Sequence, residues 1–391
     1  MFERAAFVRA YRAAEDSLSA LCRSFGISRK TAYKWLDRVE AEGEAGLEER
    51  SRAPHAHPNA LAAEVEAAVL ELRGAKGWGP KKLWARLRET LEPEVLPSVG
   101  TIANVLSRHG LVRARSRVRR ATPSSEPLAH ATACNRVWCI DFKGWFRTGD
   151  GCRVDPLTVT DAYSRYLLCC QAVTRPDGFY VQARLEAVFR AYGLPERIRS
   201  DNGAPFASTG LAGLSRLAVW WIRLGIVPER IEPGHPEQNG RHERFHLTLA
   251  QATATPPAGT PGAQQRRFDH FQREYNEERP HEALGQIPPA RLYEPSPRPY
   301  PVRLPEPVYP DEYVTRRVRG SGQIKWAGHD VRVSEALSGQ TVGLEALEDG
   351  EWRMHFGPVA LGVFNERRGE VLALAAYTRR QARRARLHNT D

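Results

Sequence analysis

The sequence predicts a multidomain protein with all-α units at the N-terminus, an α/β core with a mixed sheet, and a small all-β unit near the C-terminus. Three observations predict this order. Apolar residues at helical spacing dominate residues 1–112, strands alternate with helices over 135–250, and short β segments with Gly-containing turns follow Tyr313. A chain of 391 residues is long enough for several such domains.

Shifts in composition divide the chain into seven segments. Pro-containing stretches and an Arg-rich run mark the main boundaries. The expected segments are a helix-turn-helix unit (1–50), a second unit resembling it (51–112), a basic linker (113–129), the α/β core (130–255), a helical extension with a Pro-rich connector (256–310), a small β-barrel (311–366) and a basic tail (367–391).

The charge balance indicates a polyanionic partner. The chain has 57 Lys and Arg against 46 Asp and Glu, a net charge of +11, so nucleic acid is the first expectation. No apolar run approaches the ~20 residues of a membrane span, so we expect no membrane partner. The six cysteines have neither metal-site nor disulfide spacing and are typical of reduced thiols in a cytoplasmic protein.

Residues 1–50 have the pattern of a helix-turn-helix unit. Apolar residues at helical spacing precede Gly26, which makes the turn, and Ser28 caps a second helix over 29–40. The start of such a helix meets base edges and phosphates in DNA-binding proteins. The alternative is a helical hairpin used only for packing. The candidate DNA contacts at this position are Arg29, Lys30, Tyr33 and Lys34.

A second helical unit is expected between residues 61 and 109. It has an amphipathic helix, a helix starting at Pro80 and a third that Ser98 caps, which would be another DNA reader. An Arg-rich run follows it. Such runs are usually solvated tethers, but next to DNA-binding helices they also neutralise phosphates. The candidate contacts in these two stretches are Lys81, Lys82, Arg113, Arg115, Arg117, Arg119 and Arg120.

Three acidic positions organise the core. Residues 135–143 predict a buried strand that contains Asp141, although Asp is depleted from strands and rarely buried unpaired. A second short strand ends at Asp201, and about forty residues later a Pro/Gly-rich loop leads into a helix with another acid. Convergent carboxylates suit Mg²⁺, and two such ions about 3.5–4 Å apart can clamp an in-line phosphoryl displacement. Asp161 precedes a turn-like stretch and is interpreted as structural.

Three motifs in a fixed order produce a family resemblance. They are Trp-x-x-Asp-Phe at 138–142, Ser-Asp-Asn-Gly-x-Pro-Phe at 200–206 and His-Pro-x-x-Asn-Gly-x-x-Glu-Arg-Phe-His at 235–246. Residues 130–295 therefore resemble the integrase core of DDE transposases of bacterial insertion sequences, which share an RNase H-like fold with retroviral integrases. The N-terminal unit resembles transposase helix-turn-helix domains, and the β-barrel is similar to the SH3-like domain after some integrase cores.

The resemblance implies a function and a site. It implies metal-dependent DNA strand cleavage at element ends and strand transfer into target DNA, by a homo-oligomer bound to double-stranded DNA at the nucleoid. It also implies that Asp141, Asp201 and Glu243 are the catalytic residues and the ligands of two Mg²⁺ or Mn²⁺ ions.

The third acid has two candidates. The distance along the chain from Asp201 favours Glu237, while the motif favours Glu243, which lies on the helix seven residues after Pro236. Glu237 precedes Asn239-Gly240, in the turn before the helix, where the chain is least rigid. We therefore choose Glu243.

Three alternatives use the same residues. His242-Glu243-x-x-His246 matches the His-Glu-x-x-His pattern of zinc peptidases, but that pattern needs a third ligand and leaves Asp141 and the Asp-Asn-Gly motif unexplained. A simpler alternative is that these are surface histidines on an amphipathic helix. The non-enzymatic alternative is a sequence-specific DNA-binding protein with an inactive integrase core.

Overall fold

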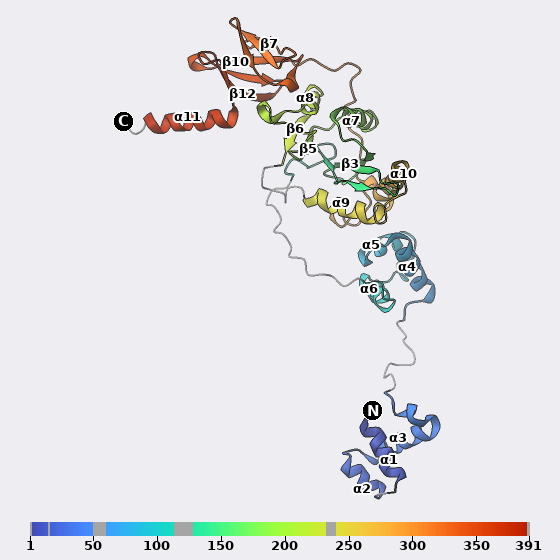
Figure 1. Ribbon diagram of the computed structural model, residues 1–391. Helices are drawn as coiled ribbons and strands as arrows, with labels where there is room; N and C mark the ends of the chain where they lie inside the picture. The colour runs from blue at the N-terminus through green and yellow to red at the C-terminus, as the bar shows by residue number, and fades with distance from the viewer. Residues whose placement is uncertain (1, 15, 50–59, 113–127, 232–239, 389–391) are drawn as a thin grey trace. The chain divides into compact units, whose positions relative to one another are not determined.

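The computed structural model shows two compact units, residues 1–63 and 64–391 (Figure 1). Among the residues it describes, no helix is both long and apolar enough to cross a membrane. The described residues are 2–14, 16–49, 60–112, 128–231 and 240–388.

The first unit consists of three short helices around a small apolar core. Phe7 and Leu21 are buried there together with Val39. Gly26 has a φ of +62°, a left-handed conformation that favours glycine, and the Ser28 hydroxyl accepts a hydrogen bond from the Thr31 N–H. The predicted turn and helix cap are therefore confirmed. The helices are α1 (Phe2–Arg12), α2 (Leu18–Ser24) and α3 (Arg29–Glu42), followed by a 3₁₀ turn (Gly43–Leu47).

Three more helices open the second unit. The second of them begins at Pro80 and the Ser98 hydroxyl caps the third, both as predicted. These helices contact the core through ion pairs, one of which joins Lys76 to Glu278 at 2.7 Å. Residues 64–112 therefore belong to the same compact unit as the core. The helices are α4 (Ala63–Lys76), α5 (Pro80–Leu87) and α6 (Val99–Arg108).

A mixed sheet forms the centre of the second unit. Its described strands follow the order β2-β3-β1-β5-β6, and β4 pairs with β3. The pairs β1–β3, β2–β3 and β3–β4 are antiparallel, while β1–β5 and β5–β6 are parallel, so the predicted α/β core with a mixed sheet is confirmed. The strands are β1 (Val137–Phe142), β2 (Phe146–Arg147), β3 (Arg153–Asp161), β4 (Leu167–Val173), β5 (Arg197–Ser200) and β6 (Val227–Arg230).

Helices cover both faces of this sheet (Figure 1). On one face, Trp138, Phe189 and Trp221 belong to a large apolar cluster, so Trp221 is a core residue. On the other face, Leu167 and Cys170 of β4 pack with Phe and Leu side chains of the covering helices. The helices on the first face are α7 (Gly178–Tyr192) and α8 (Arg216–Arg223), and those on the second are α9 (Gly240–Thr253) and α10 (Pro261–Arg273).

The Pro-rich connector packs on the core. The Arg298 guanidinium donates to the carbonyl oxygens of Pro195 (2.7 Å), Leu224 (3.0 Å) and Gly225 (2.9 Å). An extended segment with three such hydrogen bonds is a fixed part of the surface, which the Pro content alone did not indicate.

The C-terminal β segments form an open sheet. In the described residues, β13 and β7 are the first and last strands of the order β13-β12-β11-β10-β7 and do not pair with each other. Strands β8 and β9 form a separate hairpin, so the SH3-like barrel is not confirmed. Leu344 and Phe356 belong to the same apolar cluster as α8. The elements are β7 (Val314–Arg317), β8 (Gln323–Trp326), β9 (His329–Arg332), β10 (Thr341–Ala346), β11 (Glu351–Phe356), β12 (Val359–Asn365), β13 (Glu370–Ala373) and the terminal helix α11 (Leu374–His388).

His281 provides a test of the packing at the end of the core. Its ring lies against Tyr275, 4.7 Å between centroids, and burial, with the Lys82 and Arg279 charges, lowers its pKa from 6.5 to about 3. As pH falls, His281 is therefore protonated in the unfolded chain before it is protonated in the folded chain. Its contribution to stability is fully present above pH 6.5 and is lost as pH falls toward 3. His281→Asn should reduce the loss of unfolding free energy between pH 7 and pH 5 by about 2 kcal/mol, measured by urea denaturation.

The matched control is His270→Asn. The His270 side chain is 72% exposed on α10, so this change should alter the pH dependence less than His281→Asn does. Equal pH dependence in the His281 variant and the unchanged chain would show that His281 titrates normally in the folded state.

Candidate active site

Asp141 and Asp201 lie at adjacent strand ends. In the parallel β1–β5 pair, Val137 is opposite Arg197 and Cys139 is opposite Arg199, a constant offset of 60 residues. Asp141 is two residues beyond the last pair of this register, and Asp201 is one residue past the end of β5. The carboxyl ends of parallel strands meet at one edge of the sheet, so the first two predicted acids lie on neighbouring strands at the same edge.

The Asp-Asn-Gly motif shapes the turn that follows β5. Asp201 Oδ1 accepts from the Gly203 N–H at 3.1 Å, and Asn202 Nδ2 donates to the carbonyl oxygen of Ile231 at 2.8 Å. A Cβ on Gly203 would lie 2.9 Å from Asp201 Oδ2, so a side chain at this position would displace the carboxylate. The motif therefore fixes the direction of the Asp201 side chain.

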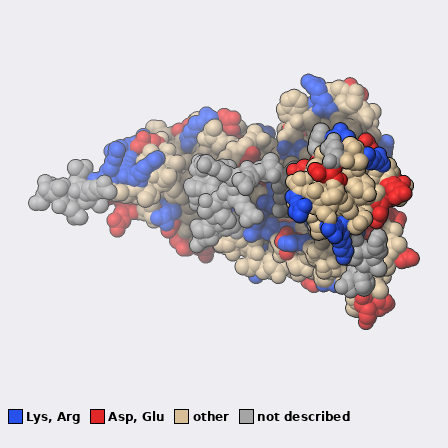
Figure 2. All heavy atoms as spheres, turned by 90° about the horizontal axis from the view of Figure 1, so that it is seen from below, with Lys and Arg blue, Asp and Glu red and all other residues tan. Residues whose placement is uncertain are grey.

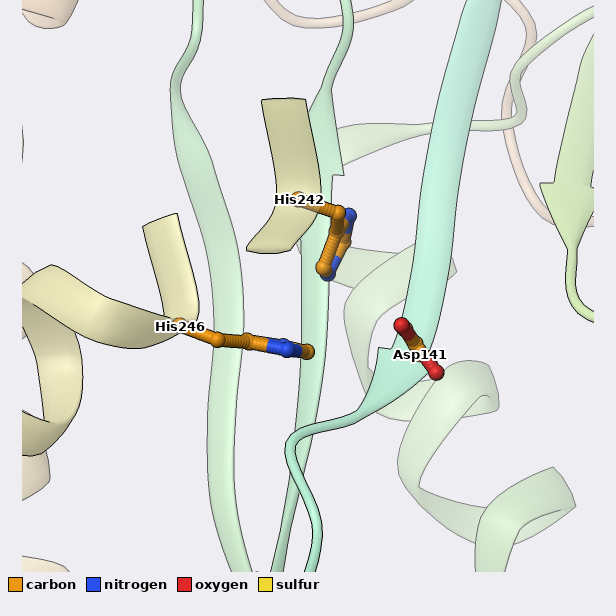
Figure 3. Close-up of side chains that lie close together, drawn as sticks. All are labelled: Asp141, His242 and His246. Atoms are coloured by element: carbon orange, nitrogen blue, oxygen red, sulfur yellow. The ribbon is translucent and has the colours of Figure 1, made fainter. Parts of the chain in front are cut away.

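Helix α9 turns its histidines toward Asp141. The face formed by His242, Phe245 and Leu249 is buried against the sheet, and His246 lies on the same face one turn from His242. Ligand atoms of Asp141, His242 and His246 all lie within 4.8 Å of one another (Figure 3). Within the described ranges, this is the one group of three His, Cys, Asp or Glu side chains close enough to hold a metal ion.

The structure does not add Glu243 or Asp201 to this group. Glu243 is exposed in the first turn of α9, next to the buried His242. Glu237, the competing candidate, lies outside the described residues. The assignment of Glu243 as third acid stays a prediction from the motif.

A threonine hydroxyl joins the histidines to the strand. Thr158 is opposite Asp141 in the β1–β3 pair, is fully buried, and its Oγ1 lies 2.8 Å from His242 Nε2, 2.9 Å from His246 Nε2 and 3.1 Å from the Asp141 carbonyl oxygen. The hydroxyl has one proton, and the carbonyl can only accept. All three hydrogen bonds form together when Thr158 donates to the carbonyl and both rings donate from Nε2.

Both histidines are neutral at physiological pH. Burial lowers the pKa of His242 to about 4. Burial, with the nearby His242 and Lys143, lowers the pKa of His246 to about 2. The interpretation of these residues as surface histidines is therefore wrong. The sequence contains a signal for this burial. His242, His246 and Leu249 recur at helical spacing on a face whose other residues are apolar.

Asp161 has a structural role, as predicted. It is fully buried, and its carboxylate accepts from the N–H groups of Asn135 (2.8 Å) and Ser164 (2.7 Å) and from the Ser164 hydroxyl (2.6 Å). These bonds close the turn between β3 and β4, so its carboxylate is engaged away from Asp141.

The predicted DNA contacts of the first unit are exposed at the start of α3. Arg29, Lys30, Tyr33 and Lys34 all have exposed side chains, and the Arg29 guanidinium also donates to the Ser19 hydroxyl. On the face of the molecule in Figure 2, Lys and Arg side chains form small groups among Asp and Glu.

The other predicted contacts have different positions. Lys81 forms an ion pair with Glu282, and Lys82 Nζ donates to the carbonyl oxygen of Pro280 at 2.7 Å. Burial, with the Arg279 charge, lowers the pKa of Lys82 to about 8. Both lysines thus face the core in this structure, and their contact with DNA stays a prediction. Arg113, Arg115, Arg117, Arg119 and Arg120 lie outside the described residues.

Comparisons with known families agree with this geometry. Two families, each described as an integrase core domain, match residues 131–236 and 224–289. A helix-turn-helix domain matches residues 3–55, and a homeodomain-like domain matches 31–106.

Two insertion-element proteins are similar in sequence. The chain is 31% identical over 215 residues to the insertion element IS476 uncharacterized 39.2 kDa protein of Xanthomonas euvesicatoria, covering 54% of this chain and 59% of that protein. It is 30% identical over 194 residues to the insertion element IS407 uncharacterized 31.7 kDa protein of Burkholderia multivorans, covering 46% and 63%. Residues 131–289 of the chain therefore match integrase core families, and the chain is similar to insertion-element proteins. It spans less than two thirds of the length of either relative.

Solved structures show weaker similarity. The simian T-cell lymphotropic virus intasome in complex with the PP2A regulatory subunit B56 gamma matches 75% of this chain and 97% of the compared chain, at 15% identity and a TM-score of 0.36. The trimeric form of the HTLV-2 integrase catalytic core domain in complex with magnesium matches 42% and 99%, at 12% identity and a TM-score of 0.34.

The Thr158 hydroxyl should contribute measurably to stability. Thr158→Val keeps the shape of the side chain but leaves two buried imidazole N–H groups without their acceptor, which should lower the unfolding free energy by about 1–3 kcal/mol. Urea denaturation of the full chain measures this change.

Thr248→Val is the matched control on α9. The Thr248 hydroxyl donates to the Arg244 carbonyl oxygen at 3.1 Å on the exposed side of the helix, so its loss should change stability by no more than about 0.5 kcal/mol. Equal losses in the two variants would show that the contacts of Thr158 with the histidines do not stabilise the fold.

Proposed function

We propose that the chain is a transposase that cleaves DNA strands at element ends and joins them to target DNA. The observation that supports this most directly is the position of Asp141 and Asp201 at adjacent ends of parallel strands, inside the segment that matches an integrase core. Glu243 completes the proposed catalytic set from the start of α9, placed there by the motif rather than by contact.

The donor atoms of this set suit Mg²⁺ or Mn²⁺. Asp141 and Asp201 would supply carboxylate oxygens, which hard divalent ions prefer. Glu243 is exposed, so its carboxylate would reach an ion without first moving out of the protein interior. Two ions bound by these residues would activate a water or a 3′-hydroxyl and stabilise the leaving oxygen. The chain itself holds the carboxylates in place through the β1–β5 register and the Asp201–Gly203 hydrogen bond.

Recognition of the element ends is assigned to the N-terminal units. The exposed basic side chains at the start of α3 would enter the major groove of double-stranded DNA, as recognition helices do. The proposed segments are those expected from the sequence: 1–50 and 51–112 for binding of the element ends, 113–129 as linker, 130–255 for catalysis, 256–310 as extension, and 311–366 with 367–391 as the C-terminal part. Assembly as a homo-oligomer on paired ends and association with the nucleoid belong to the same proposal.

Strand cleavage should depend on the three acids and on Mg²⁺ or Mn²⁺. Asp141→Asn, Asp201→Asn and Glu243→Gln each keep the side-chain shape but remove a charge that the metal ions need. Since even outer-shell changes at metal sites cost about 10–100-fold, each variant should lower the nicking rate at least about 100-fold while DNA binding persists. Nicking of a labelled DNA carrying the element end measures this.

Glu237→Gln is the matched control, with the same chemical change before the helix. It should retain substantial nicking. The reverse result, with Glu237→Gln inactive and Glu243→Gln active, would assign the third acid to Glu237. An unchanged chain that binds end DNA but nicks it with neither ion would favour the inactive-core alternative.

End binding should depend on the start of α3. Replacing Arg29 and Lys34 together by Ala removes two phosphate-directed charges, which should weaken binding of the full chain to end DNA. The slope of log affinity against log salt should fall by about 2. Fluorescence anisotropy over a salt series measures both effects.

Arg9 and Arg12 supply the control for charge alone. Both are exposed in the last turn of α1, so the double change to Ala removes the same charge from the same unit. An equal effect of the two double variants would contradict a specific role of α3.

A further inference from the structure

Two buried imidazoles and one carboxylate converge where α9 crosses the end of β1 (Figure 3). His242 and His246 come from one helical face, with ring centroids 4.6 Å apart, and Asp141 comes from the neighbouring strand. We propose that Asp141, His242 and His246 form a binding site for a borderline transition-metal ion of the Zn²⁺ or Co²⁺ type. This site differs in its donor set from the all-carboxylate site of the proposed function and shares only Asp141 with it.

The donor set selects this class of ion. Imidazole nitrogen suits Zn²⁺ and Co²⁺ better than Mg²⁺, and three protein ligands leave a fourth tetrahedral position for water. Around one tetrahedral ion the ligand atoms would lie roughly 3.3 Å apart, as Zn–N distances of about 2.0–2.1 Å require. The three side chains now lie within 4.8 Å of one another, so small side-chain rotations are enough to close the site.

The packing of the helix supports metal binding. His242 is 4% exposed and lies with Phe245 and Leu249 on the face of α9 that packs against the sheet. This packing holds the histidines beside Asp141 before any ion binds.

Thr158 orients the rings for this role. Histidines that bind a metal through one ring nitrogen usually donate the other N–H to an oxygen acceptor, which fixes the tautomer. Thr158 Oγ1 is such an acceptor for both rings, and its own proton goes to the Asp141 carbonyl oxygen. In that arrangement each ring keeps one lone pair, on Nδ1.

Occupation of this site has a consequence for the proposed catalytic ions. An ion held by His242, His246 and Asp141 takes a carboxylate that Mg²⁺ would otherwise use, so Zn²⁺ at this site competes with catalysis. The site does not create a zinc peptidase, because Glu243, the general base of that motif, is exposed and outside the group. The metal binding itself does not depend on the proposed function.

Co²⁺ absorption in the full-length, metal-free chain tests the proposal without DNA. The unchanged chain should bind one Co²⁺ tightly with visible bands of low-symmetry coordination. His242→Gln, His246→Gln and Asp141→Asn should each weaken this binding at least about 10-fold, since each removes a ligand. Asp201→Asn and the exposed control His270→Gln should bind Co²⁺ as the unchanged chain does.

The variants separate this site from the carboxylate site. Loss of Co²⁺ binding in Asp201→Asn, with retention in both histidine variants, would place the ion among the acids and overturn the proposal. Asp141 belongs to both sites, so if one histidine variant does not fold, the other histidine variant and Asp201→Asn separate them. Nicking with Mg²⁺ in the absence of Co²⁺ is scored separately, so a failure of the proposed function does not affect this result.

Discussion

Parallel pairing between β1 and β5 is the interaction on which the candidate site depends. It sets Asp141 and Asp201, which are 60 residues apart in the chain, on neighbouring strands at one edge of the sheet. Trp138 and Ile198 of these strands are buried in the apolar core with exposures of 0% and 1%, and this burial holds the register. A slip by one residue would turn these side chains toward the opposite face of the sheet, so the core that stabilises the fold also aligns the carboxylates.

Helix α9 reaches the same place by a different interaction. Phe245 and Leu249 supply the apolar contacts, while Thr158 satisfies two imidazoles and a carbonyl oxygen next to Asp141. A buried polar network is stable only when its members are hydrogen-bonded, and this one is connected through a single hydroxyl. The position of α9 relative to β1 is therefore defined by hydrogen bonding as well as by packing.

The two proposals share Asp141. On the side of β5, Asp201 would offer a second carboxylate, which suits hard ions. On the side of α9, His242 and His246 would offer ring nitrogens, which suit softer ions. In both proposals the neighbouring ligands, rather than Asp141, would decide which class of ion binds.

Local chemistry in the sequence determined much of this protein. Several features could be predicted because they depend on residues close together in the chain. They are the turn at Gly26, the cap at Ser28, the strand containing Asp141, the three motifs and the helix after Gly240. The tertiary structure alone decided the burial of His242 and the partners of Lys82. It also decided the packing of the Pro-rich connector and the open form of the C-terminal sheet. These features depend on contacts between segments far apart in the chain, and neither spacing nor composition specifies which distant surface a side chain will meet.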